Sequence, residues 1–305
     1  MHSSVQPADG SVRSDASAET GTLITPVKLR HPWRNVFAVV LILIVVFVII
    51  DASQRKAFDW PAFGKYIFDE RISQAALVTL ELTVLAMIGA IILGLLLAIM
   101  RLSPNPVLKA VSWTYVWIFR GTPLYVQLVL WGLLATIYQQ ISFGIPFREP
   151  WVSFSTSQVL SAFWLAVLGL ALNEASYLSE IMRAGIISVH RGQNEAATAL
   201  GLSWSQTMRW VVLPQAMRII IPPTGNEVIG MLKATSLVTA VPFSLDLFAK
   251  AQAISVETFN PVPLLLVACA WYLAITSVLM VGQHYLEKRF NRGTTHSGQA
   301  LASGK

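Results

Sequence analysis

Long apolar segments separated by polar ones dominate the pattern along this chain. The first, residues 36–50, is 15 residues long and carries no polar side-chain atom. Five more apolar segments follow it, at 75–100, 111–138, 159–182, 219–241 and 262–283. A membrane-spanning helix needs about 20 predominantly apolar residues. The pattern therefore predicts an all-α integral membrane protein with six transmembrane helices, the short first one completed by Trp33 and other flanking residues.

The segment before the first span differs from the rest of the chain. Residues 1–27 are rich in Ser, Ala, Gly, Thr and Asp, which predicts disorder, and Lys28, Arg30 and Arg34 follow. A cleaved signal peptide is the competing interpretation. The leader before residue 36 is too long for one, and Asp51-Ala52-Ser53 after the run is not an A-x-A cleavage site. We expect a retained membrane anchor.

Composition strengthens the membrane interpretation. Hydrophobic residues make up 54% of the chain and charged residues 12%, about half the usual share for a soluble domain. This excludes a disordered chain, a collagen and a disulfide scaffold. The net charge of +6 does not require nucleic acid, because membrane proteins collect Lys and Arg on their cytosolic flanks. The one cysteine, Cys269, lies in an apolar run and cannot form an internal disulfide.

The distribution of Lys and Arg predicts the orientation. If the N-terminus is cytosolic, the inner segments 1–35, 101–110, 183–218 and 284–305 hold 14 of these residues, and the outer segments hold 6. Cytosolic loops carry the excess of positive charge in membrane proteins. Both termini are therefore expected in the cytosol.

Several ionisable residues lie within or at the edge of the spans: Glu81, Arg120, Glu174, Glu180, Glu227 and Lys233. A charge in hydrocarbon costs a few kcal/mol or more, so each should face protein, water or a partner charge. Glu81 is near enough to its span's end to reach the interface. Arg120 precedes Gly121-Thr122-Pro123, a sequence that breaks helix regularity and exposes backbone groups. Together these residues predict a polar path through the bundle.

The fourth span carries a polar stripe. Asn173, Tyr177 and Glu180 fall within about 60° of the helix circumference. Glu180 can pair with Arg183 three residues later, which favours a structural role. Glu174 has no opposite charge at helical spacing, so a functional role is favoured for it.

The fifth span is the most polar. Asn226, Gly230 and Lys233 share one face of it, and Thr235 and Ser236 follow. A mid-span lysine needs an anionic partner. A structural ion pair, for example with Glu174, and a role in the transport path both remain open for Lys233.

The inner loop 183–218 is expected to be structured. Residues 195–200 favour a short helix, Gly201 fits the left-handed residue that ends it, and residues 203–206 match a capping box for a second helix. That second helix should be amphipathic until Pro214 disturbs it. The alternatives are an interfacial helical hairpin and a helix presented to a cytosolic partner.

This loop resembles a known motif. Glu195-Ala196-Ala197, Gly201 after three residues, and Leu213-Pro214 are similar to the EAA loop of ABC importer permeases, with Val211 in place of Ile. Further segments resemble the polar amino-acid permeases of the histidine/glutamine/arginine/opine group, namely 120–123, 175–186, 213–216, 222–227 and 233–237. The resemblance covers residues 74–290.

The resemblance implies the fold and the partners. It implies a type I ABC importer transmembrane domain at 74–286, with an extra span and external loop at 36–73 and cytosolic tails at 1–35 and 287–305. It implies a second permease subunit, a dimer of ATP-binding subunits, an extracytoplasmic solute-binding protein and an amino-acid substrate, in the bacterial inner membrane. The residues that would couple transport to the ATPase are Glu195, Ala196, Ala197, Gly201, Leu213 and Pro214.

No catalytic or metal site is expected in this chain. It has no G-x-x-x-x-G-K-[ST] sequence, so ATP and Mg²⁺ should bind to the partner subunit. The five histidines form no cluster in the sequence, which argues against a membrane-embedded enzyme. A secondary amino-acid transporter is the alternative, but it does not need an EAA loop. A purely structural anchor does not need mid-membrane charges.

An amino acid brings an ammonium and a carboxylate into the membrane, and each needs a counter-charge or hydrogen bonds there. Glu174 is the candidate for a cationic group, and Arg120 or Lys233 for the carboxylate. The whole predicted substrate path comprises Arg120, Thr122, Asn173, Glu174, Tyr177, Asn226, Lys233, Thr235 and Ser236.

Overall fold

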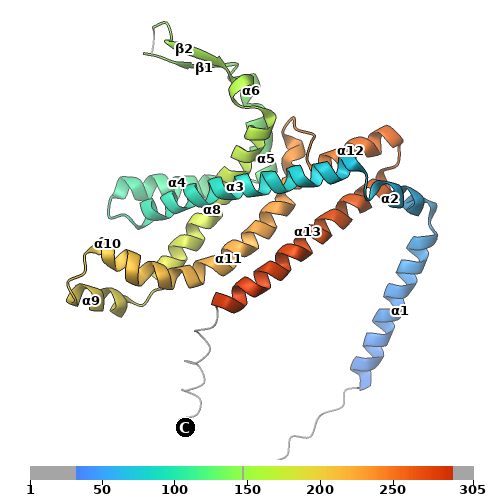
Figure 1. Cartoon of the computed structure of the whole chain (residues 1–305), viewed down its shortest axis with the longest axis horizontal. Coiled ribbons are helices and arrows are strands. Elements are labelled where there is room, and N and C mark those ends of the chain that lie inside the picture. Colours follow the sequence, from blue (N-terminus) through green and yellow to red (C-terminus); the bar gives the residue numbers. More distant parts are fainter. Residues whose placement is uncertain (1–31, 146–147, 291–305) are drawn as a thin grey trace, which may run out of the picture. The chain divides into compact units, whose positions relative to one another are not determined.

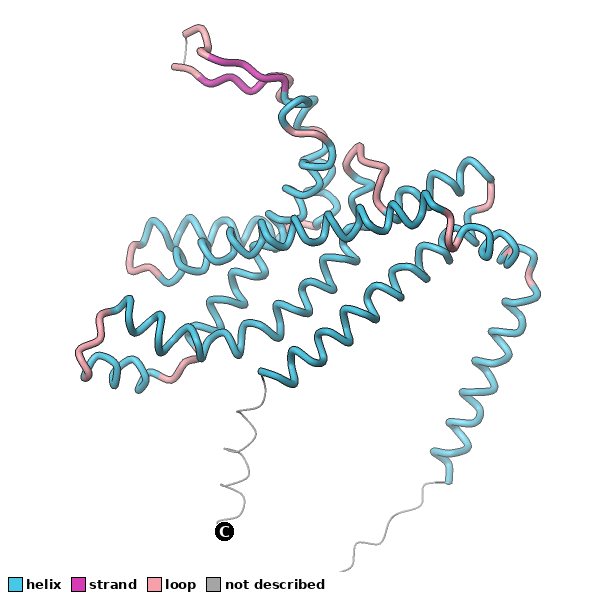
Figure 2. Tube along the Cα trace, in the orientation of Figure 1, coloured by secondary structure: helices cyan, strands magenta, loops and turns pink. Residues whose placement is uncertain are grey.

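The computed structural model describes residues 32–145 and 148–290, and most of them are helical (Figures 1 and 2). Contacts divide the chain into two units, residues 1–54 and 55–305. The predictions for residues 1–27, and for the C-terminal tail after residue 290, lie outside the described residues. The predicted helical class of the protein is confirmed.

The described part of the first unit is helix α1 (Pro32–Gln54). Its 23 residues rise about 35 Å, enough to cross a hydrocarbon core of about 30 Å. Its large apolar side chains are all exposed within the unit, on every side of the helix. An apolar surface all round is typical of a span that faces lipid. The predicted first span is therefore present and, as expected, extends beyond 36–50 at both ends.

The second unit is a helical bundle with one small hairpin. Helices α3 and α8 form its centre, α11 packs against both, and α13 packs against α11, α12 and α2. Its elements are η1 (Lys56–Phe58), α2 (Trp60–Tyr66), α3 (Glu70–Leu102), α4 (Pro106–Gly121), α5 (Leu124–Gly132), α6 (Leu134–Ile137), β1 (Gln140–Phe143), β2 (Val152–Ser155), α7 (Thr156–Val159), α8 (Ala162–Ile187), α9 (Arg191–Ala199), α10 (Trp204–Thr207), η2 (Met208–Val212), α11 (Leu213–Ala234), η3 (Thr235–Ala240), α12 (Leu247–Thr258) and α13 (Pro261–Phe290).

Small residues let α3 and α8 approach closely. A Cβ built on Gly94 would lie 3.1 Å from the Leu178 Cβ, and one on Gly89 would lie 3.2 Å from the Ala171 Cβ. Later residues of α3 thus meet later residues of α8, so the two helices run parallel. Helices in a membrane gain no hydrophobic drive from each other, and close packing of this kind holds them together.

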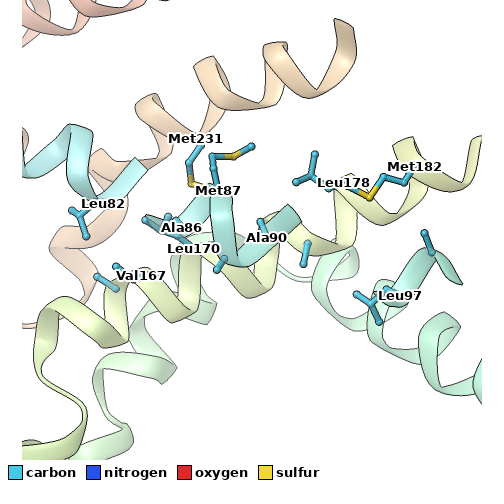
Figure 3. Packing of buried hydrophobic residues seen from close by; sticks show 14 of the residues in the cluster. Leu82, Ala86, Met87, Ala90, Leu97, Val167, Leu170, Leu178, Met182 and Met231 are labelled. Carbon is cyan, nitrogen blue, oxygen red and sulfur yellow. The ribbon is translucent and has the colours of Figure 1, made fainter. Parts of the chain in front are cut away.

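The main core lies along this helix pair. Figure 3 shows Leu82, Ala86, Ala90 and Leu97 of α3 facing side chains of α8, with Met231 of α11 packed beside them. A second core forms where α2, α12 and α13 meet the start of α3, around Ile72, Leu247 and Leu264. The Trp271 Nε1 donates to the Ile67 backbone oxygen at 2.8 Å, so α13 begins at the same end of the bundle as α3.

Four described helices are long and apolar enough to cross a membrane: α1, α3, α8 and α13. The pair α4 and α5–α6 gives a fifth, but its two parts meet at an angle of 100°. Helix α11, with 22 residues, has the length of a span but is too polar to qualify by composition. Six uniform spans are thus not found. The segment 111–138 is broken at Thr122-Pro123, and 219–241 holds two prolines together with Asn226, Glu227, Lys233 and several hydroxyl side chains.

The close approach at Gly94 gives a test of the helix pair. Gly94→Val should force the α3 and α8 backbones apart, because the new side chain meets the Ala175 oxygen and the Leu178 Cβ within about 3 Å. Overpacking of this size costs about 1–3 kcal/mol. The melting temperature of the purified complex in detergent should fall.

Gly282→Val on α13 is the matched control, since nothing lies within 4 Å of a Cβ at that position. Equal melting temperatures for the two variants would contradict the close packing of α3 on α8.

Candidate functional site

The break between α4 and α5 is held by one buried glutamine. Pro123 has no N–H, so the backbone oxygens before it lose their helical partner. The Gln127 Nε2 donates to the Phe119 oxygen at 2.9 Å, to the Thr122 oxygen at 3.1 Å and to the Thr122 Oγ1 at 2.7 Å. Exposed backbone groups are tolerated at membrane depth only when they are satisfied in this way. Our sequence analysis missed Gln127, which lies on an otherwise apolar segment.

Asn173 of α8 completes this clamp. Its Nδ2 donates to the Phe119 oxygen at 3.1 Å and to the Gln127 Oε1 at 3.0 Å, and the side chain is buried. Thr122 and Asn173, both predicted to line the path, thus fix the break to α8. Their hydrogen-bonding capacity is partly used by the protein itself.

Arg120 and Tyr177 meet beside this clamp. The Arg120 guanidinium carbon lies 5.0 Å from the centre of the Tyr177 ring, which is a cation–π contact between α4 and α8. Arg120 is exposed, and Tyr177 is about one-third exposed. Four of the predicted path residues, Arg120, Thr122, Asn173 and Tyr177, therefore gather at one place.

Glu174 lies beside a second carboxyl and makes no ion pair with Lys233. Its side chain is 8% exposed, and its Oε1 is buried without a hydrogen-bond partner among the described residues. The neighbouring ionisable group is the carboxyl of Glu227 on α11. Within the described residues no ion pair joins Glu174 to Lys233, and Lys233 itself is exposed. A carboxyl pair with an unsatisfied oxygen offers charge-assisted hydrogen bonds to a cation.

A cavity of about 490 Å³ contains the other predicted basic residue. Lys233 and Ser236 line it, together with Tyr125, Thr239 and Tyr272. Thr235 does not line this cavity, because it is fully buried and its Oγ1 donates to the Leu232 oxygen at 2.6 Å. Most of the predicted path residues therefore form two groups. One lies where the break between α4 and α5 meets α8, and the other lies on η3 and the end of α11.

The remaining membrane residues have simpler surroundings. Glu180 accepts from the Arg183 guanidinium at 2.7 Å, which confirms the structural pair predicted for them. Glu81 is exposed on α3 and Asn226 is exposed on α11. The structure brings neither of them to the carboxyl pair.

The loop 183–218 begins as predicted. Helix α9 ends at Ala199, Gly201 follows with a φ of +75°, and the Leu202 N–H donates to the Ala197 oxygen across the turn. This is a Schellman motif, which favours glycine at the left-handed position. Ser203 and Gln206 then form the predicted capping box of α10.

The continuation of this loop corrects the prediction. A single amphipathic helix ending near Pro214 was expected. Instead α10 has four residues, a π-helical turn covers Met208–Val212, and α11 begins directly at Leu213. Pro214 lies in the first turn of α11, directly after the π-helical turn, and the chain stays helical through it. The loop therefore connects rigidly to α11.

The loop presents one face outward. Ala197 is buried, whereas Glu195 and Ala196 are exposed, and Leu200 and Trp204 are 80% and 75% exposed. Behind them a cavity of about 630 Å³ lies between the loop and the end of α8, lined among others by Ile186, Val189 and Leu202. Large exposed apolar side chains of this kind mark an interaction surface.

Comparison with known families identifies the class of protein. The model of the binding-protein-dependent transport system inner membrane components matches residues 90–292, about two thirds of the chain. The chain belongs to this family.

Individual relatives narrow the class. An arginine transport system permease protein, ArgU of Corynebacterium glutamicum, is 54% identical over 270 residues, which cover 88% of this chain and 84% of that protein. A putative glutamine transport permease of Rickettsia typhi is 35% identical over 72% of this chain and 92% of its own length. The nopaline permease NocM of Agrobacterium fabrum is 37% identical over 66% of this chain and 80% of its own length.

Solved structures agree with these relatives. The crystal structure of an amino acid ABC transporter with histidines is 34% identical, with a TM-score of 0.60, over 72% of this chain and 94% of its own. The MetNI methionine ABC transporter, at 14% identity and a TM-score of 0.53, shares the fold. This chain is a membrane-spanning permease subunit of an ATP-driven amino-acid importer. The match to ArgU omits only about 12% of the chain, so it reaches into α1.

The glutamine clamp can be tested by removing its donor. Gln127→Leu leaves the Phe119 and Thr122 backbone oxygens without the Gln127 donor, and such a buried orphan costs about 1–3 kcal/mol. We expect a lower melting temperature and loss of transport. Gln252→Leu, at an exposed position on α12, is the control and should have little effect. A Gln127→Leu protein as stable as wild type would contradict the clamp.

Proposed function

We propose that this permease works in a membrane complex with a second permease subunit, two ATP-binding subunits and a solute-binding protein. The family description names binding-protein dependence, which supports the solute-binding partner. The chain has no phosphate-binding loop, so ATP and Mg²⁺ bind to the partner subunits. It hydrolyses nothing itself.

The loop 183–218 couples the complex to the ATPase. The single observation that carries this proposal is the rigid α9–α10 knob, which presents Glu195, Ala196, Leu200 and Trp204 and leads without a break into α11. Movement of a subunit bound at the knob would therefore move α11, which carries Glu227 and Lys233. Alternating access would follow as a rigid-body change in the bundle.

The substrate is a cationic amino acid. The buried carboxyl of Glu174 and the part-buried carboxyl of Glu227 would accept hydrogen bonds from a guanidinium or ammonium group, and Glu174 has an oxygen free to do so. The exposed guanidinium of Arg120 and the amine of Lys233 are available for the substrate carboxylate. The arginine transport assigned to the Corynebacterium relative supports this choice.

The protein lies in the bacterial cytoplasmic membrane with both termini in the cytosol. Helices α3 and α8 run parallel and end at the side of the loop 183–218. The basic segments 101–110 and 183–218 therefore follow the same ends of the two helices. This grouping supports the orientation that the Lys and Arg distribution predicts.

Charge removal at the carboxyl pair tests the substrate proposal. Glu174→Gln and Glu227→Gln should each lower arginine uptake at least about tenfold, because a charge-assisted hydrogen bond is worth about 1.5–3 kcal/mol. Glutamine uptake, where present, should fall less. Uptake of both labelled amino acids is measured in proteoliposomes with the solute-binding protein.

Glu257→Gln, at an exposed position on α12, is the matched control. The ion-pair hypothesis gives a different result. There Glu174→Gln would destabilise the complex, and Lys233→Met in the same chain would restore it. Such a rescue, with an unchanged preference between the two amino acids, rules out the ligand role.

A side chain at Gly201 tests the coupling role. Gly201→Val should distort the turn after α9, because a β-branched residue is strained at a φ of +75° by about 1–2 kcal/mol or more. The complex should still insert in the membrane, while substrate-stimulated ATPase activity and uptake are lost. Gly201→Asn is the control, since Asn tolerates the left-handed region. Normal stimulated ATPase activity in Gly201→Val would show that the knob is not the coupling element.

A further inference from the structure

The hairpin formed by β1 and β2 has one polar and one apolar face. Its strands pair antiparallel, with Ile141 opposite Phe154 and Phe143 opposite Val152. Successive strand residues point to opposite faces. All four of these apolar residues therefore share one face, and the other face carries Gln140, Ser142, Ser153 and Ser155.

One polar pair joins the strands across the polar face, whereas the described residues leave most of the apolar face exposed and only Ile141 half-buried. The Ser142 and Ser153 hydroxyl oxygens lie 2.9 Å apart across the strands. On the apolar face Phe143 is 60% exposed, and Val152 and Phe154 are each 46% exposed. A two-stranded hairpin is marginal at best on its own in water. Because the described residues of this unit leave most of the apolar face exposed, the hairpin needs a further surface packed against that face.

The position of the hairpin limits what can cover it. The chain enters it from α6 and leaves it through α7 to α8, and the Thr156 Oγ1 donates to the Tyr138 oxygen at its base. It thus stands at the start of α8, whereas the loop 183–218 follows the end of α8 (Figure 1). The exposed apolar side chains of Ile137 and Tyr138 lead from the bent helix pair to its base. The apolar surface of a membrane-spanning segment therefore continues into the hairpin.

The size of the face separates lipid from a protein partner. Two strands of four residues cover about 10 Å by about 13 Å, or about 130 Å². A specific protein–protein interface needs about 800 Å² from each partner. A small apolar face with two phenylalanines, backed by polar residues, suits the boundary between headgroups and acyl chains, where amphipathic elements lie flat.

We propose that the hairpin lies on the outer leaflet of the bilayer, with Ile141, Phe143, Val152 and Phe154 inserted at the level of the upper acyl chains. The inserted face fixes the outer end of the bent pair α4 and α5–α6 relative to the membrane. The polar face points to water.

Adjacent residues on the two faces provide the test. In a Cys269→Ala background, Val152→Cys and Ser153→Cys each receive an environment-sensitive fluorophore. The full complex is then placed in nanodiscs that contain a lipid spin-labelled near the top of its acyl chain. The Val152→Cys label should be quenched several-fold more strongly than the Ser153→Cys label, and its emission should be shifted to the blue.

Each other outcome overturns the proposal. Weak quenching at both positions places the hairpin in water, and equal strong quenching at both means that it does not lie flat with one face in lipid. If the Val152→Cys label is shielded only when the solute-binding protein is added, the occupant is that protein. If shielding depends on the second permease copy and persists in detergent without lipid, the occupant is that subunit.

Discussion

The fold depends on satisfying the backbone where the second apolar segment of the bundle breaks. A helix interrupted by Pro123 leaves carbonyl oxygens that would each cost several kcal/mol in hydrocarbon. Gln127 supplies donors from α5, and Asn173 supplies them from α8. Three helices are thereby tied together at one point. Arg120 and Tyr177 meet directly beside it, so the clamp also positions the polar residues of the candidate path.

The parallel pair α3 and α8 connects this clamp to the cytosolic loop. Close packing at Gly89 and Gly94 makes α8 a fixed support, with the clamp at its middle and the loop 183–218 at its end. Helix α11 starts from that loop and carries Glu227 against Glu174. A displacement of the knob would therefore change the carboxyl pair, because one carboxyl belongs to the support and the other to the helix that moves.

The sequence predicts the elements governed by local rules and misses those decided by contacts between helices. The left-handed Gly201, the capping box at Ser203 and the Glu180–Arg183 pair depend on residues within one turn of each other, and all are confirmed. Gln127 was missed because its partners, Phe119, Thr122 and Asn173, come near it only through the bend between α4 and α5. Hydrophobic periodicity does not predict the angle of that bend. The π-helical turn before Leu213 was also missed, because the hydrophobic spacing does not change there.

The charged residues in the membrane-spanning helices show most clearly what the sequence alone does not predict. The cost of a charge in hydrocarbon predicts that Glu174 and Lys233 each need a partner, and an ion pair between them is the simplest arrangement. The structure pairs Glu174 with a second carboxyl instead and leaves Lys233 beside a cavity. A negative charge on Glu174 is costly beside a second carboxyl when the site is empty, and a bound cation would lower that cost. If this pair lies in the transport path, as we propose, part of the binding energy of a cation could be spent on changing the conformation.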